Sequence, residues 1–187
     1  YSMGVHSVHP FVLLNYINSS RDVSTIAHEL GHSMHSYYAS KNQNIINANY
    51  TIMVAEVAST VNEILLANYL INKETEPMKK AALINEQLDM IRATLIRQAM
   101  FAEFEKEVYS KVEAGESLTS DILNDIYYDL VKKYFGESCI IDEEIKYEWA
   151  RIPHFYRCFY VYKYSTGITS AIVIASNILS GEEGYIE

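Results

Sequence analysis

The clearest chemistry in this sequence lies in five consecutive residues. His28, Glu29, Leu30, Gly31 and His32 form the pattern HExxH. Residues four apart share one face of a helix, so both imidazoles can reach one metal ion. Glu29 is rotated off that face, and from there it can act as the general base on a metal-bound water. Short motifs also arise by chance, but within a helix this one predicts a catalytic metal centre.

A catalytic zinc site needs a third protein ligand and an open position. Glu56 is the candidate, because it stands in the otherwise apolar stretch 52–58, where burying an unpaired carboxylate is costly. A salt bridge or a solvent-facing position is the alternative for Glu56. Two imidazoles and a carboxylate suit zinc, and cobalt or manganese would be accepted by similar ligands.

Two further side chains are candidates for supporting these ligands. Glu63 follows Glu56 by seven residues on nearly the same helix face, where it can hold a histidine by its other ring nitrogen. His35 follows His32 by three residues and is a second candidate for such support. A solvated glutamate and a surface histidine are the alternatives.

The elements that must position these residues are mostly helices. These helices are defined by apolar periodicity, by N-cap candidates such as Ser19 and Ser20, and by the placement of Pro77, Gly115 and Gly136. One short extended segment precedes them. The sequence predicts a mainly α fold, with an extended segment at 10–16 and helices near 22–40, 51–72, 77–113, 119–136, 142–149 and 155–179. The last helix is apolar almost all round, so we expect it to be buried.

Composition excludes several classes of protein. The 187 residues carry 15 Lys and Arg against 24 Asp and Glu, and a net charge of −9 does not favour nucleic-acid binding. The chain has no uninterrupted apolar run of about 18 residues, so we expect no membrane span and no membrane partner. The two cysteines do not make a disulfide framework and favour a reducing compartment, which points to the cytoplasm.

Around these residues the sequence resembles a known family, the M3 zinc oligopeptidases, and within it the oligoendopeptidase F type. The resemblance extends over nearly the whole chain. It is carried by the segments 25–35, which holds HExxH, 55–63, which holds Ala55-Glu56-Val57, and 1–4, 11–15, 151–156 and 160–164.

The resemblance implies that His28, His32 and Glu56 bind one zinc and that Glu29 is the catalytic base. It implies a helical zincin (gluzincin) catalytic region with a short N-terminal extended segment. Family members are roughly three times longer and carry a helical N-terminal lobe that encloses peptides. We therefore expect residues 1–187 to be a single domain, the C-terminal catalytic region of a longer M3-type peptidase without its N-terminal lobe.

A segment rich in tyrosine follows Pro153. A phenol or imidazole beside the metal can stabilise the oxyanion of the tetrahedral intermediate. The resemblance implies such roles for this region, and we expect His154 and Tyr162 to be catalytic and Tyr156 and Tyr160 to bind substrate. Packing of these tyrosines in the core is the alternative.

Three functions remain open. The first is a zinc endopeptidase that cleaves short peptides. The second is a zinc-binding but catalytically inactive fragment or scaffold, which would self-associate through surface that the missing lobe covers. The third is a metallopeptidase that removes residues from one end of a peptide.

Overall fold

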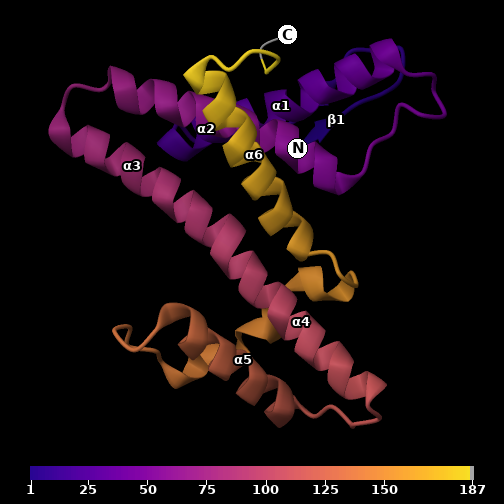
Figure 1. Cartoon of the computed structure of the whole chain (residues 1–187), viewed down its shortest axis with the longest axis vertical. Coiled ribbons are helices and arrows are strands. Elements are labelled where there is room, and N and C mark those ends of the chain that lie inside the picture. Colours follow the sequence, from indigo (N-terminus) through magenta and orange to yellow (C-terminus); the bar gives the residue numbers. More distant parts are fainter. Residues whose placement is uncertain (186–187) are drawn as a thin grey trace. The chain divides into compact units, whose positions relative to one another are not determined.

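The structure is a computed structural model that describes residues 1–185 (Figure 1). The chain folds into two compact units. The first consists of residues 1–91 and the chain from residue 166 onwards, and the second consists of residues 92–165. The prediction that residues 1–187 form one domain stays a prediction.

The first unit begins with two short antiparallel strands, β1 (Ser2–Met3) and β2 (Phe11–Val12). Ser2 pairs with Val12 and Met3 with Phe11. The expected extended segment is confirmed at β2, but its partner β1 was not predicted. The Oγ atoms of Ser2 and Ser33 lie 2.9 Å apart, so the hairpin is tied to the first helix.

Two long helices follow, α1 (Ser20–Asn42) and α2 (Ile52–Lys73). A capping box starts α1: the Ser19 hydroxyl accepts from the backbone N–H of Asp22, and the Asp22 carboxylate accepts from the N–H of Ser19. The two helices run antiparallel and pack directly on each other, with Gly31 of α1 against the backbone of Ser59 in α2. Helix α3 (Pro77–Ile91) then packs on α2.

The last helix, α6 (Tyr162–Ser180), covers α2 with small side chains. Its Ala171 and Ala175 are fully buried and pack in one cluster with Ile64 of α2. The prediction that this helix is buried is confirmed for one face only. The helix begins later than expected, and only one face is buried, while Val173 on another face is 52% exposed.

The second unit consists mainly of helices. The expected single helix over 77–113 is interrupted by a π-helical segment, η1 (Arg92–Ile96), before α4 (Arg97–Glu113). Helix α5 (Ser120–Phe135) follows, and two 3₁₀ helices, η2 (Glu143–Arg151) and η3 (Pro153–Tyr156), complete the unit. The sequence predicted helix at η2 and missed its 3₁₀ geometry.

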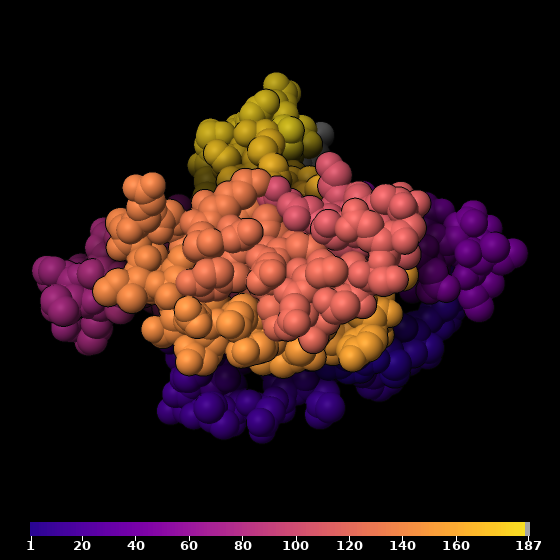
Figure 2. Space-filling model, turned by 90° about the horizontal axis from the view of Figure 1, so that it is seen from below, coloured from indigo at the N-terminus to yellow at the C-terminus, as the bar shows by residue number. Residues whose placement is uncertain are grey.

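The core of this unit is aromatic. Tyr127 of α5 has no exposed surface and lies edge-on to Phe104 of α4, with ring centroids 5.4 Å apart. Its hydroxyl donates to Glu148 at 2.6 Å, so the buried phenol is satisfied. Figure 2 shows one face of this unit, on which the residues of α4, α5 and the 3₁₀ helices form a continuous surface in coral and orange. The fold prediction, mainly α with a short extended N-terminal segment, is confirmed.

Within residues 1–185, one helix, α2, has the length and apolar composition of a membrane span. A core helix has the same length and apolar composition. Glu56 and Glu63 lie within the helix, on the side that faces α1. The prediction that the chain has no membrane partner stays a prediction.

Candidate metal centre

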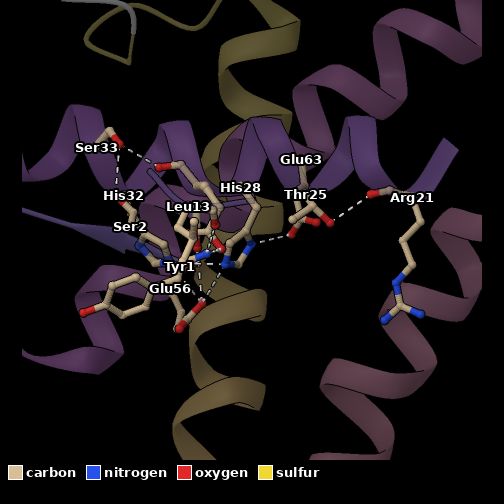
Figure 3. A network of polar contacts seen from close by, with 12 residues as sticks. Tyr1, Ser2, Leu13, Arg21, Thr25, His28, His32, Ser33, Glu56 and Glu63 are labelled. Atoms are coloured by element: carbon tan, nitrogen blue, oxygen red, sulfur yellow. Dashed lines mark hydrogen bonds and ion pairs between the residues drawn. The ribbon is translucent and has the colours of Figure 1, made fainter. Parts of the chain in front are cut away.

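The two motif histidines face each other on α1. The Nε2 atoms of His28 and His32 lie 3.2 Å apart, and the two rings are nearly perpendicular (Figure 3). Both side chains are largely buried, with 25% and 17% of their surface exposed. The four-residue spacing therefore brings two nitrogen donors to one point, as the sequence predicted.

Glu56 of α2 brings a carboxylate to the same point. Its Oε2 atom lies 3.6 Å from Nε2 of His28 and 3.9 Å from Nε2 of His32. One ligand atom from each of the three residues can be chosen so that all lie within 4.8 Å of one another. The Glu56 carboxylate also accepts a hydrogen bond from Ser59 at 3.2 Å. The three predicted ligands thus form one cluster between α1 and α2.

Glu63 orients His28 from the other side. Its Oε2 atom lies 3.0 Å from Nδ1 of His28, and its Oε1 atom accepts from the Ser24 hydroxyl at 3.0 Å. Because a carboxylate can only accept, Nδ1 carries the proton, so that whenever the ring is neutral Nε2 presents its lone pair to the cluster. Figure 3 shows His28 between Glu63 and Glu56.

The histidines have shifted pKa values. Burial lowers the pKa of His28, but the hydrogen bond and charge of Glu63, with the charges of Glu56 and Glu29, raise it overall. Burial and the neighbouring His28 lower the pKa of His32, against the charges of the two glutamates. His32 is therefore the ring that more readily stays neutral, the form that a metal ligand needs.

Glu29 lies beside the cluster and is not one of its three members. Its side chain is 12% exposed, and Oε1 lies 2.8 Å from the amino group of Tyr1. Its negative charge acts to raise the pKa of both His28 and His32. The role of Glu29 as general base stays a prediction.

His35 lies apart from the ligand contacts. Its ring stacks on Tyr50, with centroids 3.7 Å apart, and its buried Nδ1 has no hydrogen-bond partner within the described residues. The Tyr50 hydroxyl in turn lies 2.5 Å from Oγ of Ser36. Burial and the nearby His32 lower the pKa of His35. The His35 ring thus contacts the segment before α2. Its support of the metal ligands stays a prediction.

The remaining predicted site residues belong to the second unit. His154 lies against Tyr160, with ring centroids 5.8 Å apart, and also contacts Tyr164 at 5.9 Å. The hydroxyls of Tyr160 and Tyr164 lie 3.0 Å apart. Tyr156 and Tyr162 are 87% and 44% exposed. The structure thus joins His154 and Tyr160 with Tyr164, a residue that was not among the predicted site residues.

Sequence reasoning also missed Ser24 and the role of Gly31. Ser24 precedes His28 by one helical turn, and that spacing alone was the signal that could have found it. A Cβ on Gly31 would lie 2.7 Å from the Cα of Ser59, so the motif glycine permits the close approach of α2. That contact depends on a distant part of the chain.

Comparison with known proteins identifies the class to which this fold and cluster belong. The family described as "Peptidase family M3" matches residues 2–185, and the chain belongs to this family. This confirms the resemblance drawn from the sequence.

Particular relatives are oligoendopeptidases. The chain is 48% identical over 179 residues to "Oligopeptidase PepF" of Bacillus subtilis, covering 96% of this chain and 27% of that protein. It is 43% identical to "Oligoendopeptidase F homolog" of Borreliella burgdorferi, covering 100% and 32%. The crystal structure of oligoendopeptidase-F from Enterococcus faecium aligns with a TM-score of 0.77 at 42% identity, over 89% of this chain and 30% of that one. The chain thus spans less than a third of the length of these relatives.

Proposed function

We propose that this chain carries the catalytic metal centre of a peptidase that hydrolyses peptide bonds in short oligopeptides. The observation that carries the proposal is the cluster of His28, His32 and Glu56, whose ligand atoms lie within 4.8 Å of one another. Membership of peptidase family M3 and the oligopeptidase names of the relatives support the same reaction.

Zinc is the proposed cofactor, one per chain. Ligands bound at about 2.1 Å to a tetrahedral zinc lie about 3.4 Å apart, and the separations of 3.2, 3.6 and 3.9 Å in the cluster are close to that value. Three protein ligands leave one position open, as catalytic sites do. A zinc held there would polarise the scissile carbonyl and lower the pKa of a water molecule.

The protein's own residues perform the proton transfers. Glu29 takes a proton from the attacking water and delivers it to the departing amine. Glu63 holds the His28 ring by Nδ1, which keeps Nε2 directed at the cluster and makes it a stronger donor.

Four residues of the tyrosine-rich segment take the remaining roles in this proposal. His154 and Tyr162 donate to the oxyanion that develops on the scissile carbonyl, and Tyr156 and Tyr160 bind the peptide. The support is the family resemblance together with the exposure of Tyr156 and Tyr162. Because His154 and Tyr162 act on the transition state, their loss is expected to lower kcat, whereas loss of Tyr156 or Tyr160 is expected mainly to raise KM.

Metal content and peptide cleavage test the proposal together. Wild type and Glu29→Gln are purified without added metal, metal is measured by plasma mass spectrometry, and cleavage of internally quenched peptides is followed. We expect about one zinc per chain in both proteins and turnover in the wild type alone. Glu76→Gln, at an exposed position, is the matched control and should keep wild-type turnover.

Two results would contradict the proposal. A fully active Glu29→Gln would remove the general base from the mechanism. Zinc binding without any turnover by the wild type would favour the alternative, a metal-binding but inactive chain. Peptides with blocked termini distinguish an endopeptidase from a peptidase that removes residues from one end, because only the endopeptidase cleaves them.

We also propose a cytoplasmic location and short peptides as the partners. Cys139 and Cys158 are both free and exposed, which suits a reducing compartment. The net charge of −9 argues against nucleic acid as a partner.

Self-association remains an alternative, because Leu30 and Met34 on the outer face of α1 are 48% and 51% exposed. Light scattering decides it, and fractionation of cells that make the protein tests the location.

A further inference from the structure

The second unit contains a turn in a costly backbone conformation. Phe159 has φ of +52°, and within residues 1–185 only Ser7 and Asn18 share a positive φ among residues other than glycine. An aromatic residue is rarely found there, because its Cβ crowds the backbone. The Phe159 side chain is 52% exposed, so burial of its ring does not explain the conformation. Other contacts must hold it.

Two residues of α4, one helical turn apart, contact this turn. The backbone N–H of Phe159 donates to Oε1 of Glu105 at 2.6 Å. The Tyr109 hydroxyl donates to Sγ of Cys158 at 3.0 Å, and its ring lies 4.9 Å from that of Phe159. Helix α4 therefore binds both the backbone and the side chains of the turn.

Glu105 is an unusual residue to find at this place. It is 5% exposed, and within residues 1–185 no lysine, arginine or histidine pairs with it. Burial raises the pKa of its carboxyl, against the hydrogen bond from Phe159. A buried carboxyl without a cation is destabilising unless it satisfies another group, and here that group is the amide of the turn.

The turn joins the two halves of an aromatic cluster. His154 lies in η3 before it, and Tyr160 and Tyr164 follow it. The Tyr160 ring stacks on His154, and its hydroxyl lies 3.0 Å from that of Tyr164. The backbone conformation at Phe159 sets the direction of the chain that follows, and this direction determines whether the Tyr160 ring can stack on His154.

We propose that Glu105, aided by Tyr109, is a positioning residue that holds the turn at Phe159 and thereby sets the arrangement of His154 and Tyr160. This inference rests on the proposed function, in which both residues act on the peptide. Glu105 itself touches neither substrate nor metal in this scheme. It acts through the backbone amide of Phe159.

The test uses the full chain and two NMR signals. Labelling phenylalanine with ¹⁵N gives at most six amide signals, because the chain has six Phe. The Phe159 signal is assigned with Phe159→Gly, and the His154 ring signal is assigned with His154→Gln in ¹³C-histidine protein.

In Glu105→Ala we expect the Phe159 amide proton to move upfield and the His154 ring signal to shift. In Glu105→Gln, which keeps an acceptor, the His154 signal should stay near its wild-type position. Glu107→Ala, exposed on the same helix, is the control and should leave both signals unchanged.

A second variant covers the case in which Glu105→Ala does not fold. Glycine adopts positive φ without the Cβ conflict, so Glu105→Ala/Phe159→Gly should return the His154 signal towards its wild-type position. Unchanged Phe159 and His154 signals in Glu105→Ala would overturn the proposal. So would a shifted Phe159 amide with an unmoved His154 signal, and so would a folded double variant whose His154 signal stays displaced.

Kinetics then separate this inference from the proposed function. With zinc content equal to that of the wild type, Glu105→Ala should lower kcat about tenfold with little change in KM, and Glu105→Gln should recover most of it. Wild-type kcat in Glu105→Ala would overturn the positioning role. Absence of turnover in the zinc-loaded wild type would instead be a failure of the proposed function, and the NMR comparison would still decide whether Glu105 holds the turn.

Discussion

Gly31 of α1 lies directly against the backbone of Ser59 in α2. A Cβ at residue 31 would be 2.7 Å from the Cα of Ser59 and 2.8 Å from the carbonyl oxygen of Ala58. Both neighbours are backbone atoms of a helix, which cannot move aside singly. Gly31 is also the residue just before the second motif histidine, so this contact sets how closely Glu56 approaches the histidines.

Replacing Gly31 with alanine should separate the helices and weaken the metal site. We expect Gly31→Ala to lower the free energy of unfolding by about 1–3 kcal/mol and to reduce zinc affinity, because the added methyl group overpacks the interface. Denaturant unfolding and zinc competition with a chromophoric chelator measure the two effects.

Gly167→Ala is the matched control for this prediction. A Cβ at residue 167 would lie 3.7 Å from the Cβ of Glu56, which is ordinary van der Waals contact. This variant should bind zinc like the wild type, although it too lies beside a ligand. Wild-type zinc affinity in Gly31→Ala would refute the link between close helix packing and the ligand cluster.

The Glu63 carboxylate should contribute to zinc affinity without contacting the metal. Glu63→Gln weakens the charge-assisted hydrogen bond to Nδ1 of His28, and an amide can also present an N–H in place of the acceptor. We expect zinc affinity to fall about tenfold or more in Glu63→Gln. Ser24→Ala, which removes only the hydroxyl that donates to Glu63, should cause a smaller loss. Competition titrations at one pH measure both, and equal affinity in Glu63→Gln and the wild type would contradict the assignment.

Much of the fold could be predicted from local signals. Ser19 and Asp22 mark the start of α1, Pro77 begins α3, and Gly136, with φ of +75°, ends α5. Each of these residues acts through its own backbone or that of its neighbours, so the sequence alone contains the information.

Features that depend on distant residues were not predictable in this way. The π-helical segment Arg92–Ile96 was not predicted. Its extra residue per turn cannot be recognised from the apolar pattern of so short a window. Strand β1 has two residues and exists through its pairing with β2. The buried face of α6 is defined by Ala171 and Ala175 against α2, which hydropathy did not distinguish from its exposed face.

The candidate site likewise contains some residues that could be predicted from local spacing and others that could not. HExxH defined His28, Glu29 and His32 through helical spacing alone, and Glu56 was a candidate because a carboxylate interrupts an apolar stretch. The hydrogen bond from Ser24 to Glu63 and the partnership of Tyr164 with His154 are tertiary contacts. No spacing rule distinguishes those residues from other serines and tyrosines in the chain.

Substitutions in the tyrosine-rich segment should separate binding from catalysis. We expect Tyr162→Phe and His154→Gln to lower kcat about a hundredfold with unchanged zinc content, because each removes a donor to the oxyanion. Tyr156→Phe should act mainly on KM. Tyr69→Phe, 56% exposed in α2, is the control. Steady-state kinetics at matched zinc loading decide the matter, and wild-type kcat in Tyr162→Phe would move the role to another residue.

Glu148 should make the stability of the second unit depend on acid. Its carboxylate is 10% exposed and accepts from Tyr127, Arg97 and Arg151. Burial works against ionisation, but the hydrogen bond from Tyr127 and the charges of the two arginines lower the pKa of Glu148 overall from its ordinary value of 4.5. A lowered pKa means that the folded chain binds the proton less readily than the unfolded chain does. The stabilisation is therefore complete above pH 4.5 and is lost as the pH falls through the folded-state pKa.

Glu148→Gln removes this charge while keeping the size of the side chain. We expect it to lower the free energy of unfolding by about 1–3 kcal/mol at neutral pH, because two arginines and a phenol lose an ionised partner. The difference from the wild type should shrink as the pH is lowered from about 7 to about 3, where the wild-type carboxyl becomes protonated. Denaturant unfolding at a series of pH values measures it, with Glu143→Gln, 81% exposed on the same segment, as the control. A difference that stayed constant across this range would mean that packing of the side chain, and not its charge, stabilises the unit.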